Sequence, residues 1–186
     1  LELGDIERSL DTLLGREIDY GEVFVQSTRG ESFALEDGIV KEGSFGVEAG
    51  IGLRALAGER TGFAYSEDIR LDGLKQAAKA ARSIAGSGSQ RRAPGFKAVD
   101  FAPLYAPTDP ISSLTDEDKV KLLRQIDQTA RAQDDKVKEV TVRIAGNHES
   151  VLVMASDGTL AADIRPLVRL DVSVIVEHNG RRERGN

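Results

Sequence analysis

The feature that most constrains the fold is a change of hydrophobic period along the chain. Apolar residues alternate with polar or small residues in two separate regions, 20–65 and 140–176. Alternation with a period of two places successive side chains on opposite faces of a strand, so each region predicts half-buried strands. Between and before these regions, apolar residues recur three or four positions apart, which is typical of amphipathic helices. We therefore predict an α+β domain in which antiparallel β-meanders pack against about three helices.

The three expected helices each begin after a residue that can cap a helix. The first follows Asp5, the second follows Ser66, and the third follows Thr115, with Asp118 three residues later. Short oxygen-bearing side chains at these positions accept a hydrogen bond from an N–H group that the first helical turn leaves without a partner. The pattern predicts three helix starts at these sites.

Glycine-containing pairs divide the alternating regions into strands. Asp-Gly or Asn-Gly between apolar runs favours a tight hairpin turn, because both turn positions adopt positive φ. We expect a meander of about five short strands in the first region and further strands in the second. The expected turns lie at Gly30, Asp37-Gly38, Gly58, Gly146-Asn147, Asp157-Gly158 and Asn179-Gly180.

The two alternating regions contain similar segments in the same order. Residues 22–25 resemble 139–142, and an Asp-Gly turn follows each at a similar distance. This similarity suggests an internal duplication with halves of about 1–85 and 113–186, and the Pro- and Gly-rich stretch of about 86–112 is predicted to link them. The alternative is that hairpin proteins reuse the same turns and valine-rich strands without duplication.

Composition excludes several functional classes. The chain has 186 residues, of which 31 are acidic and 25 basic, giving a formal net charge of −6 that does not favour direct nucleic-acid binding. Because it has no cysteine, it has no disulfide, thiolate metal site or cysteine nucleophile, which suits a reducing cytoplasm. No apolar stretch approaches the roughly 20 residues of a membrane span, and no signal peptide is recognisable. We expect a cytoplasmic protein without a membrane partner.

The two histidines do not form a recognisable catalytic pattern. His148 is followed by Glu149, but no second histidine lies one helical turn away, as a zinc-binding helix requires. His148 and Ser150 lie two residues apart on an expected strand and point the same way, but they cannot easily form an oriented triad without a third partner. We interpret His148 as an exposed turn residue, and we predict neither a catalytic residue nor a metal ligand in this chain.

Glycines and arginines inside the expected strands are the remaining candidates. Gly50 and Gly52 form a lone Gly-x-Gly without a following helix, so close backbone packing or a bulge is expected there rather than a phosphate loop. Arg54, Arg165 and Arg169 interrupt or border apolar strands. Such arginines usually have a carboxylate partner or face an interface. We predict these three as substrate or interface residues.

Four segments, spread over nearly the whole chain, carry a family resemblance. They are Glu-Asp-Gly-Ile-Val-Lys-Glu-Gly-Ser at 36–44, Gly-Ile-Gly-Leu-Arg-Ala at 50–55, Gly-Phe-Ala-Tyr at 62–65 and Ser-Asp-Gly-Thr-Leu-Ala-Ala-Asp-Ile-Arg-Pro-Leu-Val-Arg-Leu at 156–170. In this order and spacing they resemble the N-terminal region of the TldD/PmbA family, and TldD more than its PmbA (TldE) paralogue.

The resemblance implies a cytosolic zinc metalloprotease of bacteria or archaea that cuts unfolded peptides. It also implies a complex of TldD-like and TldE-like subunits, with roles in microcin maturation, antitoxin turnover and modulation of DNA gyrase. In that family, a His-Glu-x-x-x-His motif and a cysteine hold the zinc, downstream of the segment that is Arg-Glu-Arg-Gly at 182–185 here. This chain contains neither the motif nor a cysteine, so the resemblance implies zinc only in the full-length family protein.

The expected function is therefore that of a non-catalytic N-terminal domain, inactive alone, whose catalytic domain is not in this chain. It would contribute to subunit assembly and to the substrate chamber. Its expected partners are a TldE/PmbA-like paralogous subunit or a second copy, and an unfolded peptide in the full enzyme. One alternative is a stand-alone protein-interaction module that modulates DNA gyrase. Another is a small enzyme with an unrecognised site, for which Glu149 would be the first residue to replace.

Overall fold

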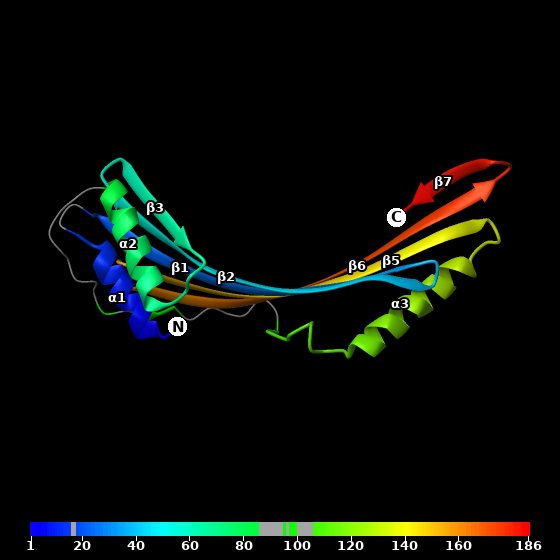
Figure 1. The fold of residues 1–186 in the computed structure, drawn as a ribbon, viewed down its shortest axis with the longest axis horizontal. Helices are drawn as coiled ribbons and strands as arrows, with labels where there is room; N and C mark the ends of the chain where they lie inside the picture. The colour runs from blue at the N-terminus through cyan, green and yellow to red at the C-terminus, as the bar shows by residue number, and fades with distance from the viewer. Residues whose placement is uncertain (16–17, 86–94, 96, 100–105) are drawn as a thin grey trace. The chain divides into compact units, whose positions relative to one another are not determined.

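The computed structural model describes residues 1–15, 18–85, 95, 97–99 and 106–186 (Figure 1). These residues form three helices and seven strands, which confirms the predicted α+β class. In chain order the elements are α1 (Leu3–Leu13), β1 (Tyr20–Glu36), β2 (Ile39–Ala57), β3 (Arg60–Ser66), α2 (Leu71–Ala85), β4 (Lys97–Ala98), α3 (Asp116–Arg131), β5 (Val137–Ala155), β6 (Thr159–His178) and β7 (Arg181–Gly185).

The strands form a seven-stranded sheet in the order β3-β2-β1-β5-β6-β4, with β7 also paired to β6. The pairs β2/β3 and β6/β7 are antiparallel, whereas the short β4 runs parallel to β6. The N–H of Ser156 donates to the carbonyl of Gly21, and the N–H of Asp37 donates to the carbonyl of Val140. The start of β1 thus lies beside the end of β5 and the end of β1 beside its start, so these two strands are also antiparallel.

The first alternating region forms two long strands and the seven-residue β3, and the prediction of about five short strands was wrong. Asp37 and Gly38 adopt positive φ and form a turn, as expected, but Gly30 lies inside β1 and Asn147 lies inside β5. A Cβ atom on Gly30 would lie 2.8 Å from the side-chain oxygen of Asn147. Gly30 therefore serves a close approach between strands rather than a turn.

Two of the three expected helix caps differ from the prediction. Glu2, not Asp5, is the N-cap of α1, and its N–H donates to the carboxylate of Asp5 at 3.3 Å in a capping box. The hydroxyl of Ser66 accepts a hydrogen bond from the N–H of Asp68 at 3.0 Å, which stabilises the turn before α2 rather than the helix itself. Both differences arise because several oxygen-bearing side chains near each helix start compete for the same N–H groups.

The third helix begins as predicted. Thr115 is the N-cap of α3, and its hydroxyl accepts a hydrogen bond from the N–H of Asp118 at 3.2 Å. Three acidic residues in the first turn also oppose the positive end of the helix dipole. The helix ends at Arg131.

The chain divides into two compact units, which we call unit 1 and unit 2. Unit 1 contains Leu1–Thr28, Glu48–Ala106 and Glu149–Ile164, and unit 2 contains Arg29–Val47, Pro107–His148 and Arg165–Asn186. Strands β1, β2, β5 and β6 each contribute to both units. Each unit combines segments from both halves of the proposed duplication, and the duplication itself stays a prediction. Most of the predicted linker at 86–112 lies outside the described residues.

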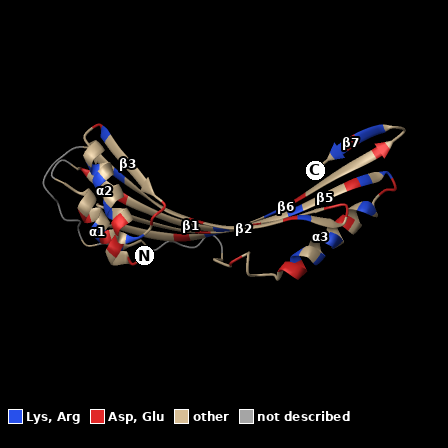
Figure 2. Ribbon diagram, in the orientation of Figure 1, with Lys and Arg blue, Asp and Glu red and all other residues tan. Residues whose placement is uncertain are grey.

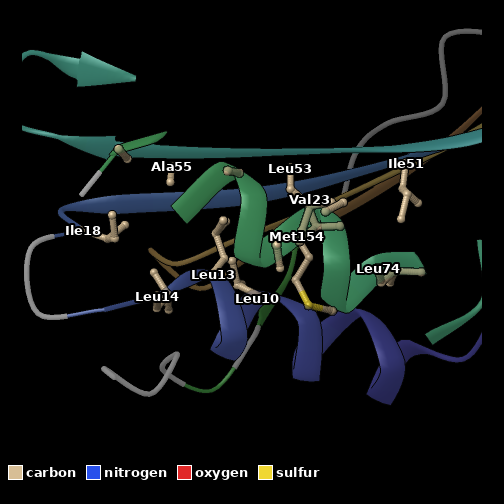
Figure 3. Packing of buried hydrophobic residues seen from close by; sticks show 14 of the residues in the cluster. Leu10, Leu13, Leu14, Ile18, Val23, Ile51, Leu53, Ala55, Leu74 and Met154 are labelled. Atoms are coloured by element: carbon tan, nitrogen blue, oxygen red, sulfur yellow. The ribbon is translucent and has the colours of Figure 1, made fainter. Parts of the chain in front are cut away.

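Unit 1 has an apolar core between its strands and the helices α1 and α2. Figure 3 shows Leu10 and Leu13 from α1 and Leu74 from α2 close to strand residues of this core. A Cβ atom on Gly62 of β3 would lie 1.9 Å from the carbonyl oxygen of Ala81, so α2 packs directly against the backbone of β3. Glycine at this position is required by the close approach of helix and strand.

Unit 2 has a smaller apolar core beneath the single helix α3. Its fully buried members are Leu35, Leu123, Val140 and Val142. Lys119 of α3 is also buried, with 3% of its surface exposed. A buried ammonium group requires polar partners, and those of Lys119 are the carboxylate of Glu31 and the carbonyl of Ile111.

None of the helices within the described segments is long and apolar enough to cross a membrane.

Candidate functional site

Arg54 lies on β2 in unit 1, on the face of the sheet away from the helices. Its neighbours Leu53 and Ala55 are buried in the core, so the alternation of the strand directs Arg54 to the opposite face. The Nε atom of Arg54 lies 2.9 Å from a carboxylate oxygen of Glu22 on β1. The hydroxyl of Tyr20 donates to the other oxygen of Glu22 at 2.9 Å. One carboxylate therefore joins a guanidinium group and a phenol on the same face.

The electrostatics of this cluster keep the phenol neutral. Burial, then the hydrogen bond to Glu22 and the negative charge of that residue, together raise the pKa of Tyr20 to about 12. Tyr20 therefore remains a hydrogen-bond donor at neutral pH. Together with Arg54, it fixes the carboxylate of Glu22 from two sides.

Two exposed aromatic residues lie beside Arg54 on the neighbouring strand. Phe63 of β3 pairs directly with Arg54, and Tyr65 pairs with Gly52. Phe63 is 57% exposed and Tyr65 is 75% exposed. A Cβ atom on Gly52 would lie 3.3 Å from the ring of Phe63, which confirms the expected close packing at the Gly-x-Gly segment. We call Arg54, Phe63 and Tyr65 the Arg54 surface.

Arg165 and Arg169 lie on β6 in unit 2. They are four residues apart, so both side chains lie on the same face of the strand. The Nε atom of Arg169 lies 2.8 Å from the carboxylate of Asp171 on that face. The structure thus brings Arg165 and Arg169 together on one strand and places Arg54 in the other unit.

The stretch of β6 that carries these arginines is a strand edge. On the side away from β5, strand β4 pairs with residues 159–160 and β7 with residues 174–178. No strand among the described residues pairs with 165–173 on that side, and we call this stretch the β6 edge. Its exposed large apolar residues are Leu167 (61%), Val168 (56%) and Leu170 (48%). Figure 2 shows basic and acidic residues together in the β6 and β7 region.

Sequence reasoning missed the apolar residues of the β6 edge. Proline within a strand is usually confined to sheet edges, because it cannot donate a ladder hydrogen bond. Pro166 was therefore the signal in the sequence that this strand has an open side.

His148 lies in a different setting from the predicted one. His148 lies inside β5 rather than in a turn, and its Nδ1 atom lies 3.4 Å from a guanidinium nitrogen of Arg29. The same nitrogen of Arg29 donates to Asp109 at 2.8 Å. His178 ends β6, with its Nε2 atom 3.3 Å from the side-chain nitrogen of Asn179.

The described residues of this chain do not fit a zinc site. Zinc sites in proteins use three or four ligands from histidine, cysteine and carboxylate side chains in a tetrahedral arrangement. Within the described ranges, no group of three or more such side chains is placed to hold a metal ion. His148, one of two histidines in a chain without cysteine, lies beside the positive charge of Arg29. A bound cation would be repelled at that position.

Comparison of the sequence with models of known protein families assigns the chain to a class of metallopeptidase. A model described as PmbA/TldA metallopeptidase domain 1 matches residues 21–85, and one described as the PmbA/TldA metallopeptidase central domain matches residues 109–186. The two matched segments cover most of the sequence. The chain belongs to the PmbA/TldD metallopeptidase family.

Individual relatives are proteins named metalloprotease TldD homolog. The chain is 49% identical over 178 residues to the one from Haemophilus influenzae, covering 95% of this chain and 37% of that protein. It is 39% identical over 181 residues to one from Buchnera aphidicola of Acyrthosiphon pisum, covering 97% and 38%. The chain thus spans less than two fifths of the length of these curated relatives.

Solved structures with low sequence identity share the fold. A candidate modulator of DNA gyrase from Bacteroides thetaiotaomicron has a TM-score of 0.76 at 16% identity, covering 97% of this chain and 43% of that chain. TldE from Thermococcus kodakarensis has a TM-score of 0.69 at 15% identity, covering 97% and 40%. The same fold therefore occurs in a protein named TldE, at an identity that supports similarity of fold alone.

Proposed function

We propose that this chain is a non-catalytic N-terminal domain of a cytoplasmic TldD-like zinc metalloprotease that processes unfolded peptides. The observation that carries the proposal is the combination of family membership with the lack of a fitting metal-ligand group in the described part of the chain. Zinc and the hydrolytic groups would then belong to parts of the full-length protein outside these 186 residues. The domain would contribute to subunit assembly and to the substrate chamber.

The β6 edge supports the assembly role. A strand edge with unpaired N–H and C=O groups can add a strand from another chain, with main-chain hydrogen bonds giving affinity. The edge also exposes Leu167, Val168 and Leu170, whose burial would stabilise such a contact. The partner in the full enzyme would be a TldE/PmbA-like subunit or a second copy of this chain.

The Arg54 surface supports the substrate role. Aromatic residues and arginine are enriched where proteins bind other polypeptides. Phe63 and Tyr65 offer exposed rings beside Arg54, and Arg54 is held in place by Glu22. We assign to this surface the contact with an unfolded peptide in the full enzyme.

The test compares hydrolysis of an unstructured fluorogenic peptide by this chain and by a full-length family protein that contains it, each with and without EDTA. Activity in the longer protein alone, lost with EDTA, is the expected result. Turnover by the 186 residues would overturn the proposal and direct attention to Glu149. In the longer protein, Arg54→Ala should raise KM several-fold with little change in kcat, since it removes a binding contact. Arg70→Ala is the matched control, because Arg70 also pairs with a carboxylate in unit 1.

A second candidate function is that of a stand-alone module that modulates DNA gyrase. The name of the similar solved structure from Bacteroides thetaiotaomicron favours it. Saturable binding of purified gyrase to this chain, measured by titration calorimetry, would support the second candidate. An absence of binding, together with EDTA-sensitive hydrolysis by the longer protein, would leave the first.

A further inference from the structure

The main-chain groups of the β6 edge point outward at even-numbered residues. Along a strand, successive N–H and C=O groups alternate between the two neighbouring strands. The N–H of Glu177 donates to the carbonyl of Lys136 at the start of β5, so the odd-numbered residues face β5. The N–H and C=O groups of Val168 and Leu170 therefore point to the side on which no described strand pairs with β6.

Pro166 fits this arrangement. It belongs to the even-numbered set, so the N–H that proline lacks would have pointed outward rather than toward β5. The proline costs the sheet no hydrogen bond between β5 and β6. It removes one donor from the outward side, while the donors of Val168 and Leu170 remain.

The side chains of the β6 edge form a self-complementary pattern. One face carries Asp163, Arg165, Leu167, Arg169 and Asp171, and the other face carries the apolar residues Ile164, Pro166, Val168 and Leu170. Arg165 and Asp171 lie three residues before and three residues after Val168 on this strand. An antiparallel copy of the same segment would place opposite charges beside each other.

We propose that a second copy of this chain pairs with the β6 edge as an antiparallel strand, about a two-fold axis at Val168. This register places Arg165 of each copy opposite Asp171 of the other, and Pro166 opposite Leu170. The two apolar rows then continue across the interface. The inference rests on the assembly role proposed above and names the partner and the register.

Three neighbouring registers are excluded by charge or by β7. An axis at Leu167 places Arg165 opposite Arg169, and an axis at Arg169 places Arg169 opposite itself, so both bring like charges together. An axis at Leu170 places Pro166 of the second copy opposite Val174. Val174 is already paired with Gly185 of β7, so the second copy would collide with that strand.

The other exposed edge of unit 2 lacks this self-complementarity. Residues 39–48 of β2 are exposed, and β3 pairs with β2 only from residue 51 onward. In a two-fold antiparallel pair, each residue lies opposite a residue of the other copy whose side chain is on the same face. The sequence numbers of two opposite residues therefore differ by an even number. Lys41 lies at odd separations from both Glu42 and Glu48, so no such register pairs the lysine with either acid. The geometry therefore favours the β6 edge over the β2 edge.

The first experiment uses the absence of cysteine in the chain. Val168→Cys introduces a single thiol at the proposed axis, and Ile39→Cys introduces one on the β2 edge at a similarly exposed position. Treatment with a short bismaleimide should convert Val168→Cys into covalent dimer at least about 10-fold faster than Ile39→Cys. Equal rates for the two variants would overturn the proposed axis.

The second experiment measures solution mass by sedimentation velocity over a range of protein concentrations. The unmodified chain should form dimers, and Arg165→Asp or Asp171→Arg alone should raise the dimer dissociation constant by about 10-fold or more, because like charges then oppose each other twice. The double variant Arg165→Asp/Asp171→Arg should restore the dimer. Restoration by Arg169→Asp/Asp171→Arg instead would overturn the register.

The result that would overturn the second-copy proposal differs from the result that would overturn the proposed function. A chain that stays monomeric at all concentrations overturns the second-copy proposal, even if it then binds a TldE-like subunit through the β6 edge. The hydrolysis comparison between this chain and the longer protein does not depend on that result. It alone decides whether the domain is non-catalytic.

Discussion

The two units share four strands but are stabilised by different physical means. Unit 1 buries a cluster of sixteen apolar residues beneath two helices, whereas the buried cluster beneath the single helix of unit 2 has four. The buried charged residues of the described chain, Lys119 and Asp127, both lie on α3 in unit 2. Unit 1 is therefore held mainly by apolar packing, and unit 2 depends more on ion pairs at its helix.

The buried pair of unit 2 shows how a charge is accommodated there. The Nζ atom of Lys119 lies 2.5 Å from a carboxylate oxygen of Glu31 on β1, and it donates to the carbonyl of Ile111 at 2.7 Å. It also lies 5.8 Å from the centre of the Phe33 ring. These contacts connect α3, the preceding loop and β1 within unit 2 through one side chain.

The largest expected effect is therefore the loss of one partner of this pair. Lys119→Met should reduce the free energy of unfolding by about 3–5 kcal/mol, because Glu31, whose side chain is 11% exposed, would lose its cation. Urea unfolding measures the loss, and amide hydrogen exchange should show that unit 2 opens first. The double variant Lys119→Met/Glu31→Leu should recover most of the stability. If the single variant is as stable as the parent, ion pairing does not hold unit 2.

The next largest effect concerns the packing of unit 1. Gly62→Ala places a Cβ atom 1.9 Å from the carbonyl oxygen of Ala81, so α2 must move away from β3. We expect a loss of about 1–3 kcal/mol, with increased hydrogen exchange confined to unit 1. Gly46→Ala is the matched control, since no atom lies within 4 Å of its added Cβ and it lies in unit 2. Equal losses in the two variants would argue against tight packing at Gly62.

A third prediction concerns acid unfolding of unit 2. Hydrogen bonding from the N–H of Val140, and then from the Arg131 guanidinium, holds the pKa of Asp37 below its usual range. Because the folded pKa is lowered, the ionised carboxylate stabilises the fold above the unfolded pKa of about 4. That stability is lost as the pH falls through the folded value. Unfolding curves at a series of pH values should show a weaker acid dependence for Asp37→Asn than for the parent chain.

A fourth prediction concerns alkaline conditions and unit 1. The pKa of Tyr20 is raised to about 12, chiefly by burial and then by Glu22. Because the folded pKa is raised, stability from the neutral phenol is complete below the unfolded pKa of about 10 and is lost as the pH rises toward 12. Tyr20→Phe should remove this loss. An ultraviolet titration of tyrosinate in the parent and in Tyr20→Phe provides the check. The absorbance change that the parent shows and Tyr20→Phe lacks should titrate near pH 12.

The smallest expected effect is at an exposed ion pair of unit 2. A guanidinium nitrogen of Arg143 lies 3.8 Å from a carboxylate oxygen of Glu42, and both side chains are more than half exposed. Arg143→Ala should change the free energy of unfolding by less than about 0.5 kcal/mol, because solvent screens such a pair. Urea unfolding beside Lys119→Met provides the contrast. A loss above about 1 kcal/mol would show that exposed charges also hold unit 2.

Local sequence patterns determined the types of element and several of their boundaries. Alternation predicted strands, helical spacing predicted three helices, and the Thr115 cap of α3 is where the sequence placed it. The expectation that strand arginines require carboxylates also holds for Arg54 and Arg169. These features follow from interactions between residues close in the chain or from the chemistry of one side chain, so the sequence alone is sufficient for them. The role of these arginines in binding stays a prediction.

Only the tertiary structure decided which strands are neighbours and which residues they bury. Glycine is typical of turns, yet Gly30 lies inside β1, next to the side chain of Asn147 from the distant strand β5. Lysine on a helix is usually exposed to solvent, yet Lys119 is buried, and the carboxylate of Glu31 makes its burial possible. The open side of β6 likewise exists because β4 and β7 pair only with its two ends. Each outcome depends on contacts between residues far apart in sequence, which local periodicity and turn chemistry do not encode.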